Sequence, residues 1–112
     1  MSETELLRRV QVAVSVLGAR LFRNHVGLFY TRTGVPVKIG TVGTADLLGW
    51  VTITVTPALV GKKLAIFLAL EAKSPTGRVT AAQSVFLETV RRAGGIGAVV
   101  RSEDDAAQAL AQ

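Results

Sequence analysis

Two carboxylates and a lysine stand beside apolar segments at spacings that suit hydrolytic chemistry. Asp46 directly precedes one apolar segment, and Glu71 and Lys73 follow another, with Ala72 between them. Because side chains alternate along a strand, Glu71 and Lys73 project from the same face, whereas Ala72 projects from the other. If the segment after Asp46 lies alongside, Asp46 and Glu71 present oxygen atoms to one hard cation, Mg²⁺ or Mn²⁺.

A cation held in this way is suited to the hydrolysis of a phosphodiester. It activates a water molecule and stabilises the negative charge that develops on the phosphate, and a neighbouring lysine assists both tasks. The residues therefore predict a metal-dependent nuclease site in which Asp46 and Glu71 bind the metal and Lys73 is the catalytic cation.

An Asp followed by Glu-x-Lys resembles the PD-(D/E)xK nuclease superfamily, and nearly the whole chain is similar to its VRR-NUC family of virus-type replication and repair nucleases. One departure is visible, because Ala45 stands where the superfamily name has proline. That proline shapes a turn and does not bind metal. The resembling segments are a glutamate in the opening helix, Arg23–Gly27, Ile39–Gly49, Glu71–Lys73, Gly77–Gln83 and Ala93–Ser102.

The resemblance implies an α/β fold with a restriction-endonuclease-like core, in which helices flank a mixed central β-sheet, in a single domain of residues 1–112. It implies a structure-selective DNA endonuclease that acts as a homodimer on branched DNA such as Holliday junctions. The alternative interpretation is a catalytically silent nucleic-acid-binding subunit of a repair or phage assembly. The intact Glu-x-Lys spacing argues against that alternative.

The opening segment carries a third acidic candidate. Ser2 and Glu5 have the spacing of a capping box, which predicts a helix that continues to about Ala19. Glu3 falls on the inward face of this helix, and the resemblance assigns it to the metal site, directly or through water. Without the resemblance, Glu3 is better interpreted as a first-turn carboxylate that interacts with the helix dipole. The expected buried stripe of the helix consists of Leu6, Val10, Ala13, Val14 and Leu17.

Gln83 has two interpretations that are compatible with each other. Thr80 and Gln83 form a second capping-box pattern, so the amide of Gln83 could cap the helix that begins there. The first turn of this helix must also lie near the strand end that carries Lys73, so Gln83 could also orient Lys73, water or a phosphate. The candidate catalytic residues are thus Glu3, Asp46, Glu71, Lys73 and Gln83. The expected buried residues of the helix, which should stop at Gly94 and Gly95, are Ala82, Val85, Phe86 and Val90.

The segments between the two helices favour strands. Leu64–Leu70 is apolar at every position, which is typical of a short strand buried in the middle of a sheet. Leu47–Val55 is rich in Val, Ile, Thr and Trp, and its Trp50 is assigned to the core. The other expected elements are a hairpin over residues 29–39 that turns near Gly34, a strand over Ile96–Val100 and a final helix capped by Ser102.

The net charge of +5 and the sequence pI near 10.5 suit a polyanionic partner such as nucleic acid, although such a charge also serves solubility alone. The resemblance places Arg23 and Asn24 near the substrate backbone. His25 is the only histidine and has no zinc-ligand partners, so it is interpreted as an ordinary loop residue. The other candidate phosphate contacts are Arg32 and Lys38 on the hairpin and Arg78 before the second helix.

Several other classes of protein do not fit the sequence. The apolar runs are shorter than the ~20 residues that a membrane-spanning helix needs. The chain opens with an amphipathic, charged segment instead of a signal peptide, and it has no cysteine. We therefore expect no membrane partner and an intracellular location, in the cytoplasm of a bacterium or of a phage-infected host.

Overall fold

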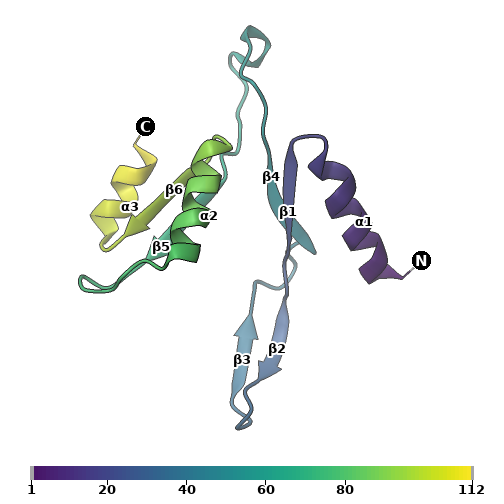
Figure 1. Cartoon of the computed structure of the whole chain (residues 1–112), viewed down its shortest axis with the longest axis vertical. Coiled ribbons are helices and arrows are strands. Elements are labelled where there is room, and N and C mark those ends of the chain that lie inside the picture. The colour runs from purple at the N-terminus through teal and green to yellow at the C-terminus, as the bar shows by residue number, and fades with distance from the viewer. Residues whose placement is uncertain (1, 112) are drawn as a thin grey trace. The chain divides into compact units, whose positions relative to one another are not determined.

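The computed structural model describes residues 2–111 and divides the chain into two compact units, one up to Ile53 and one from Thr54 onward (Figure 1). The single-domain assignment of residues 1–112 stays a prediction. The first unit contains α1 (Glu3–Ser15), β1 (Ala19–Arg23), β2 (Gly27–Tyr30), β3 (Pro36–Ile39) and β4 (Leu47–Val51). The second contains the 3₁₀ helix η1 (Pro57–Leu59), β5 (Leu68–Ala72), α2 (Ala81–Arg92), β6 (Ile96–Val100) and α3 (Glu103–Leu110).

Helix α1 begins where the capping pattern predicts and ends earlier than predicted. The hydroxyl of Ser2 accepts a hydrogen bond of 3.1 Å from the backbone N–H of Glu5. The Glu5 carboxylate does not close the box, because it forms an ion pair of 3.0 Å with Arg9. The helix ends at Ser15, four residues short of Ala19, since Gly18 adopts a φ of 84° that is typical of a helix terminus.

One narrow stripe of α1 packs against β1. The half-buried residues of this stripe are Leu7, Val10, Gln11 and Val14. Gln11 fastens the helix to the strand by donating a hydrogen bond of 3.1 Å from Nε2 to the carbonyl oxygen of Leu21. The wider predicted stripe is therefore wrong at three positions, which are exposed because β1 covers only one side of the helix: Leu6, Ala13 and Leu17.

The strands of the first unit form two antiparallel pairs. β1 pairs with β4, and the rings of Phe22 and Trp50 lie on this pair with their centroids 5.5 Å apart. Trp50 is half-buried. β2 pairs with β3 in a hairpin whose turn is closed by a hydrogen bond of 2.9 Å from Gly34 N to Thr31 O. The predicted hairpin and its turn are confirmed.

The second unit is built on a parallel pair of strands. β5 pairs with β6, α2 connects them and packs against both, and α3 packs against β6 (Figure 1). Leu87 and Val90 of α2 are its buried core, with 3% and 0% of their surface exposed. Gln83, Leu87 and Val90 recur at helical spacing, so the stripe that forms the core continues to Gln83 in the first turn. The predicted burial is confirmed for Val90 and wrong for three exposed residues: Ala82, Val85 and Phe86.

The general α/β class is confirmed, but one mixed central sheet is not. Among residues 2–111 the strands form three two-stranded sheets, two antiparallel and one parallel. β5 begins at Leu68, four residues after the predicted start at Leu64, and Leu68 and Leu70 are exposed. The interpretation of this segment as a strand buried on both faces is therefore wrong, because Leu68 and Leu70 lie on the face opposite Glu71, the residue that α2 contacts through Gln83.

Gly97 of β6 gives a test of how closely α2 packs on this strand pair. A Cβ atom at this buried position would lie 2.6 Å from the backbone carbonyl oxygen of Leu87, so the helix and the strand would have to separate. We expect Gly97→Ala to lower the free energy of unfolding by ~1–3 kcal/mol, the range of an overpacked core. Urea denaturation followed by circular dichroism measures this loss. Gly77→Ala is the control. The atom nearest to its new Cβ is the flexible Ser74 hydroxyl, 3.1 Å away, so the free energy of unfolding should fall by less.

Candidate functional site

Glu71 and Lys73 lie together at the carboxyl end of β5. The ammonium Nζ of Lys73 is 3.5 Å from Oε1 of Glu71, as expected for alternate residues that share a strand face. Lys73 follows the strand, and its backbone N–H donates a hydrogen bond of 3.0 Å to Val100 O, which keeps it in line with β6. The Lys73 and Glu71 side chains are 19% and 32% exposed. The pair is therefore partly shielded from solvent, unlike a fully exposed surface ion pair.

Gln83 closes the predicted capping box and also contacts Glu71, whereas its orientation of Lys73, water or a phosphate stays a prediction. Its Oε1 accepts a hydrogen bond of 3.0 Å from the backbone N–H of Thr80, and its own N–H donates one of 3.1 Å to the Thr80 hydroxyl. Its Nε2 donates a hydrogen bond of 2.8 Å to Oε1 of Glu71. Because the capping box holds Oε1 toward Thr80, Nε2 is directed at Glu71. The helix cap thus fixes the amide that orients the carboxylate.

The two oxygens of the Glu71 carboxylate differ in their contacts within residues 2–111. Oε1 contacts both the Lys73 ammonium and the Gln83 amide, whereas Oε2 takes part in no hydrogen bond or ion pair within residues 2–111. A carboxylate oxygen held in one orientation is a suitable ligand for a hard cation. Such a cation would require further oxygen ligands besides Glu71.

Arg101 holds the loop that follows Lys73, a role that sequence reasoning missed. Its Nη1 donates hydrogen bonds of 2.6 Å to Ser74 O and 2.8 Å to Gly77 O. Its backbone N–H donates to Asp105 Oδ2 at 2.8 Å, which fastens it to the start of α3. The sequence feature that could have indicated this role is the position of Arg101 directly after β6, the strand that pairs with β5. Arg101 therefore acts as a brace for the loop.

The other two carboxylate candidates belong to the first unit. Asp46 is exposed and directly precedes β4, as predicted, and its carbonyl oxygen accepts a hydrogen bond of 2.8 Å from Asn24 N. Glu3 is the first residue of α1 and is exposed. No group of three or more His, Cys, Asp or Glu side chains that could hold a metal occurs among residues 2–111. The sharing of one cation by Asp46, Glu71 and Glu3 stays a prediction.

Asn24 positions the loop that leads to Asp46. Its Nδ2 donates hydrogen bonds of 2.7 Å to the Thr44 hydroxyl and 2.9 Å to Ala45 O. Both amide hydrogens are therefore used within the protein, and Oδ1 is the side-chain atom left for another partner. These hydrogen bonds join residues about twenty positions apart, so no local sequence pattern predicts them. The contact of Asn24 with a substrate backbone stays a prediction.

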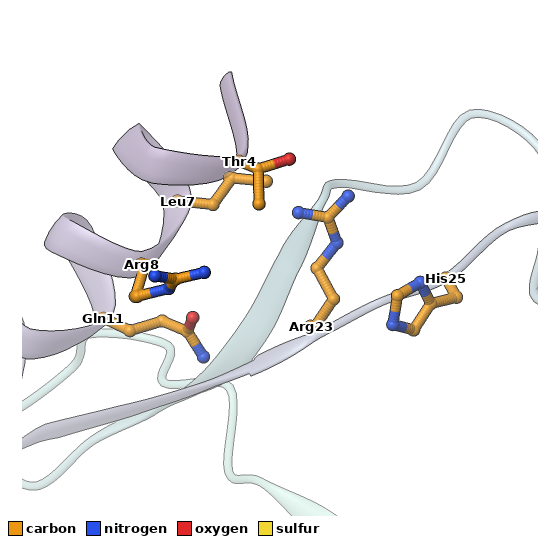
Figure 2. A pocket seen from close by; sticks show the side chains of 6 residues that line it. All are labelled: Thr4, Leu7, Arg8, Gln11, Arg23 and His25. Carbon is orange, nitrogen blue, oxygen red and sulfur yellow. The ribbon is translucent and has the colours of Figure 1, made fainter. Parts of the chain in front are cut away.

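The predicted phosphate contacts are all exposed cations. In the first unit, Arg32 lies in the hairpin turn and Lys38 lies on β3 opposite Leu28. Arg78 is in the loop before α2, in the same unit as Glu71. Arg23 ends β1 and lines a hollow of the first unit (Figure 2).

Comparisons of the chain with protein-family models, with curated proteins and with solved structures found no match. Membership of the VRR-NUC family therefore stays a prediction. Among the described residues, no helix is long and apolar enough to cross a membrane.

Proposed function

We propose that this protein is a metal-dependent endonuclease that hydrolyses phosphodiester bonds of DNA. The observation that carries the proposal is the convergence of Lys73 Nζ at 3.5 Å and Gln83 Nε2 at 2.8 Å on one oxygen of Glu71. A generic surface ion pair does not need a third polar side chain from another element. Here a strand end supplies the carboxylate and the lysine, and a helix cap supplies the amide that orients them.

The residues fit a site for Mg²⁺ or Mn²⁺ in the chemistry of their donor atoms. Glu71 Oε2 is available, and Asp46 and Glu3 would supply the further oxygen ligands, Glu3 directly or through water. Such a cation activates water and stabilises charge on the phosphate when it is bound. Lys73 would donate hydrogen bonds to the phosphate oxygens, and Gln83 would keep Glu71 in its ligand orientation.

Branched DNA and a homodimeric protein complete the proposal. The net charge of +5 and the exposed cations on the hairpin support a polyanionic partner. A homodimer would double the surface that these residues offer to a four-way junction. We place the activity in the cytoplasm of a bacterium or a phage-infected host, where such junctions arise.

A cleavage assay on a four-way junction tests the proposed function. The protein is incubated with labelled junction in Mg²⁺, in Mn²⁺ and in EDTA, and the products are resolved on a denaturing gel. Strand nicks that require the metal support the endonuclease. Tight junction binding without any cleavage in either metal would instead favour a catalytically silent binding subunit.

We expect the affinity for the junction to fall steeply with salt, because cations that neutralise phosphates release bound counterions. Replacing Arg32 and Lys38 together by alanine should reduce the slope of log affinity against log salt by about 2, one for each lost phosphate contact. Fluorescence anisotropy in EDTA, from low to physiological salt, measures the slope. Arg9→Gln is the control, because Arg9 is already paired with Glu5 at 3.0 Å. An affinity that does not change with salt would contradict an electrostatic mode of binding.

A further inference from the structure

The first unit contains a hollow of about 340 Å³ between α1 and the segment that leaves β1. Figure 2 shows the side chains of Arg8 and Arg23 extending into the space between helix and strand, with the ring of His25 on the far side of Arg23 from the helix. The residues that line the hollow are Thr4, Leu7, Arg8, Gln11, Arg23 and His25.

Helical spacing and one hydrogen bond explain why these side chains meet. Thr4, Arg8 and Gln11 lie four and three residues apart, so they share one face of α1. The hydrogen bond from Gln11 Nε2 to Leu21 O holds this face against β1. Arg23 lies two residues after Leu21 on the same strand, so its side chain emerges on the same strand face as that of Leu21.

The hollow is lined by cations that have no counter-ion in the described part of the chain. Its lining includes two guanidinium groups and an imidazole but no carboxylate. Within residues 2–111, Arg8 and Arg23 form no ion pair, whereas their neighbour Arg9 is paired with Glu5. Two like charges brought to one hollow repel each other unless an anion lies between them. The arginine fork matches the oxygens of a phosphate in a bidentate geometry.

We propose that this hollow binds the terminal phosphate of a nucleotide, either free or at the end of a nucleic-acid strand. A phosphate monoester carries about −1.5 to −2 charges, which two guanidinium groups can balance, whereas a diester carries one. The volume lies near the lower end of the ~300–1,000 Å³ of ligand sites, so a sugar or base can also enter. Leu7 offers an apolar contact for the base, and Thr4 and His25 offer polar groups to the phosphate.

This site goes beyond the proposed endonuclease, because it uses none of the residues at the end of β5. Arg8 and His25 join Arg23 in binding one phosphate, a role that differs from a general contact with the DNA backbone. Its occupation requires no divalent cation and no cleavage. The binding experiment can therefore fail while the nuclease proposal holds, and the reverse is also possible.

Binding in EDTA tests the proposal with matched ligands. A short single-stranded oligonucleotide with a 5′ phosphate should bind at least tenfold more tightly by fluorescence anisotropy than the same oligonucleotide with a 5′ hydroxyl. A 3′-phosphorylated strand is tested in the same way. If the source is a free nucleotide, a deoxynucleoside 5′-monophosphate binds in calorimetry and displaces the labelled strand. Equal affinity for phosphorylated and unphosphorylated strands, together with no binding of the mononucleotide, would overturn the proposal.

Variants at the exposed arginines localise the site. Arg8→Gln and Arg23→Gln should each lower affinity for the preferred phosphorylated ligand at least tenfold, and Arg8→Lys should recover only part of it, because lysine lacks the planar fork. Arg9→Gln on the next helix position should leave affinity unchanged. Circular dichroism checks that each variant is folded. Loss of affinity in Arg9→Gln equal to that in Arg8→Gln would show a general charge effect and would also overturn the assignment.

Discussion

Glu71→Gln should abolish the metal-dependent cleavage of a four-way junction while junction binding persists. The substitution nearly preserves the shape of the side chain but removes its negative charge. It also places an amide against Lys73 Nζ and Gln83 Nε2, both of which donate to the present carboxylate. Loss of a charged metal ligand removes several kcal/mol of transition-state stabilisation, so we expect a rate at least ~100-fold lower. Single-turnover cleavage in Mg²⁺, with anisotropy for binding, measures both quantities.

Glu88→Gln is the matched control for this change. Glu88 is an exposed glutamate of α2 whose carboxylate pairs with Arg91 at 3.1 Å and with Arg92 at 3.4 Å. It takes no part in the proposed metal site. Its loss should leave cleavage unchanged. Asp46→Asn should behave as Glu71→Gln does if both residues hold one cation. Full cleavage by Glu71→Gln with unchanged metal dependence would remove the proposed site from consideration.

The features of this chain that sequence predicts well are short-range. The hydroxyls of Ser2, Thr80 and Ser102 cap their helices as expected, because each cap needs only a donor three residues later. The hairpin turn at Gly34 is equally local. Gln83 could be placed near Glu71 for a related reason: its capping box fixes one end of the amide, and the helix starts soon after the strand that carries the carboxylate.

Burial could not be predicted in the same way, because it depends on partners that are distant in sequence. Leu68 and Leu70 belong to an apolar run typical of a central strand, yet they lie on the face of β5 opposite the one that α2 contacts, and both side chains are exposed. Val85 and Phe86 are apolar but lie off the stripe of α2 that faces the strands. The brace from Arg101 to Ser74 spans 27 residues, and no periodic pattern encodes such a contact.

The contacts of the candidate site also differ in sequence range. Glu71 and Lys73 are two residues apart on one strand, so their contact follows from strand geometry. Joining Asp46 to Glu71 requires a contact between the two units of the chain, which no short-range pattern specifies. Lys73 is therefore the residue at which the chemistry of the Glu-x-Lys sequence is tested most directly.

Lys73→Ala should lower the single-turnover rate of cleavage by roughly two orders of magnitude or more, the scale of losing one transition-state donor. Lys73 shares a strand face with Glu71 and lies 3.5 Å from its carboxylate, so a phosphate beside Glu71 would be within its reach. A lysine that only holds the DNA backbone would weaken affinity and leave the rate at saturating DNA unchanged, because its binding is uniform. We expect the opposite behaviour, with junction affinity preserved.

Lys62→Ala distinguishes these two kinds of lysine within the same unit. Lys62 is exposed in the turn after η1 and has no carboxylate partner among residues 2–111, so its loss should affect affinity slightly and the rate of bound junction not at all. Lys73→Arg keeps the charge but replaces a compact ammonium by a planar fork, so it should recover the rate only in part. If Lys73→Ala cleaved bound junction at the parental rate while Lys62→Ala did not, the assignment of Glu71 and Lys73 to chemistry would be wrong, and their ion pair would be structural.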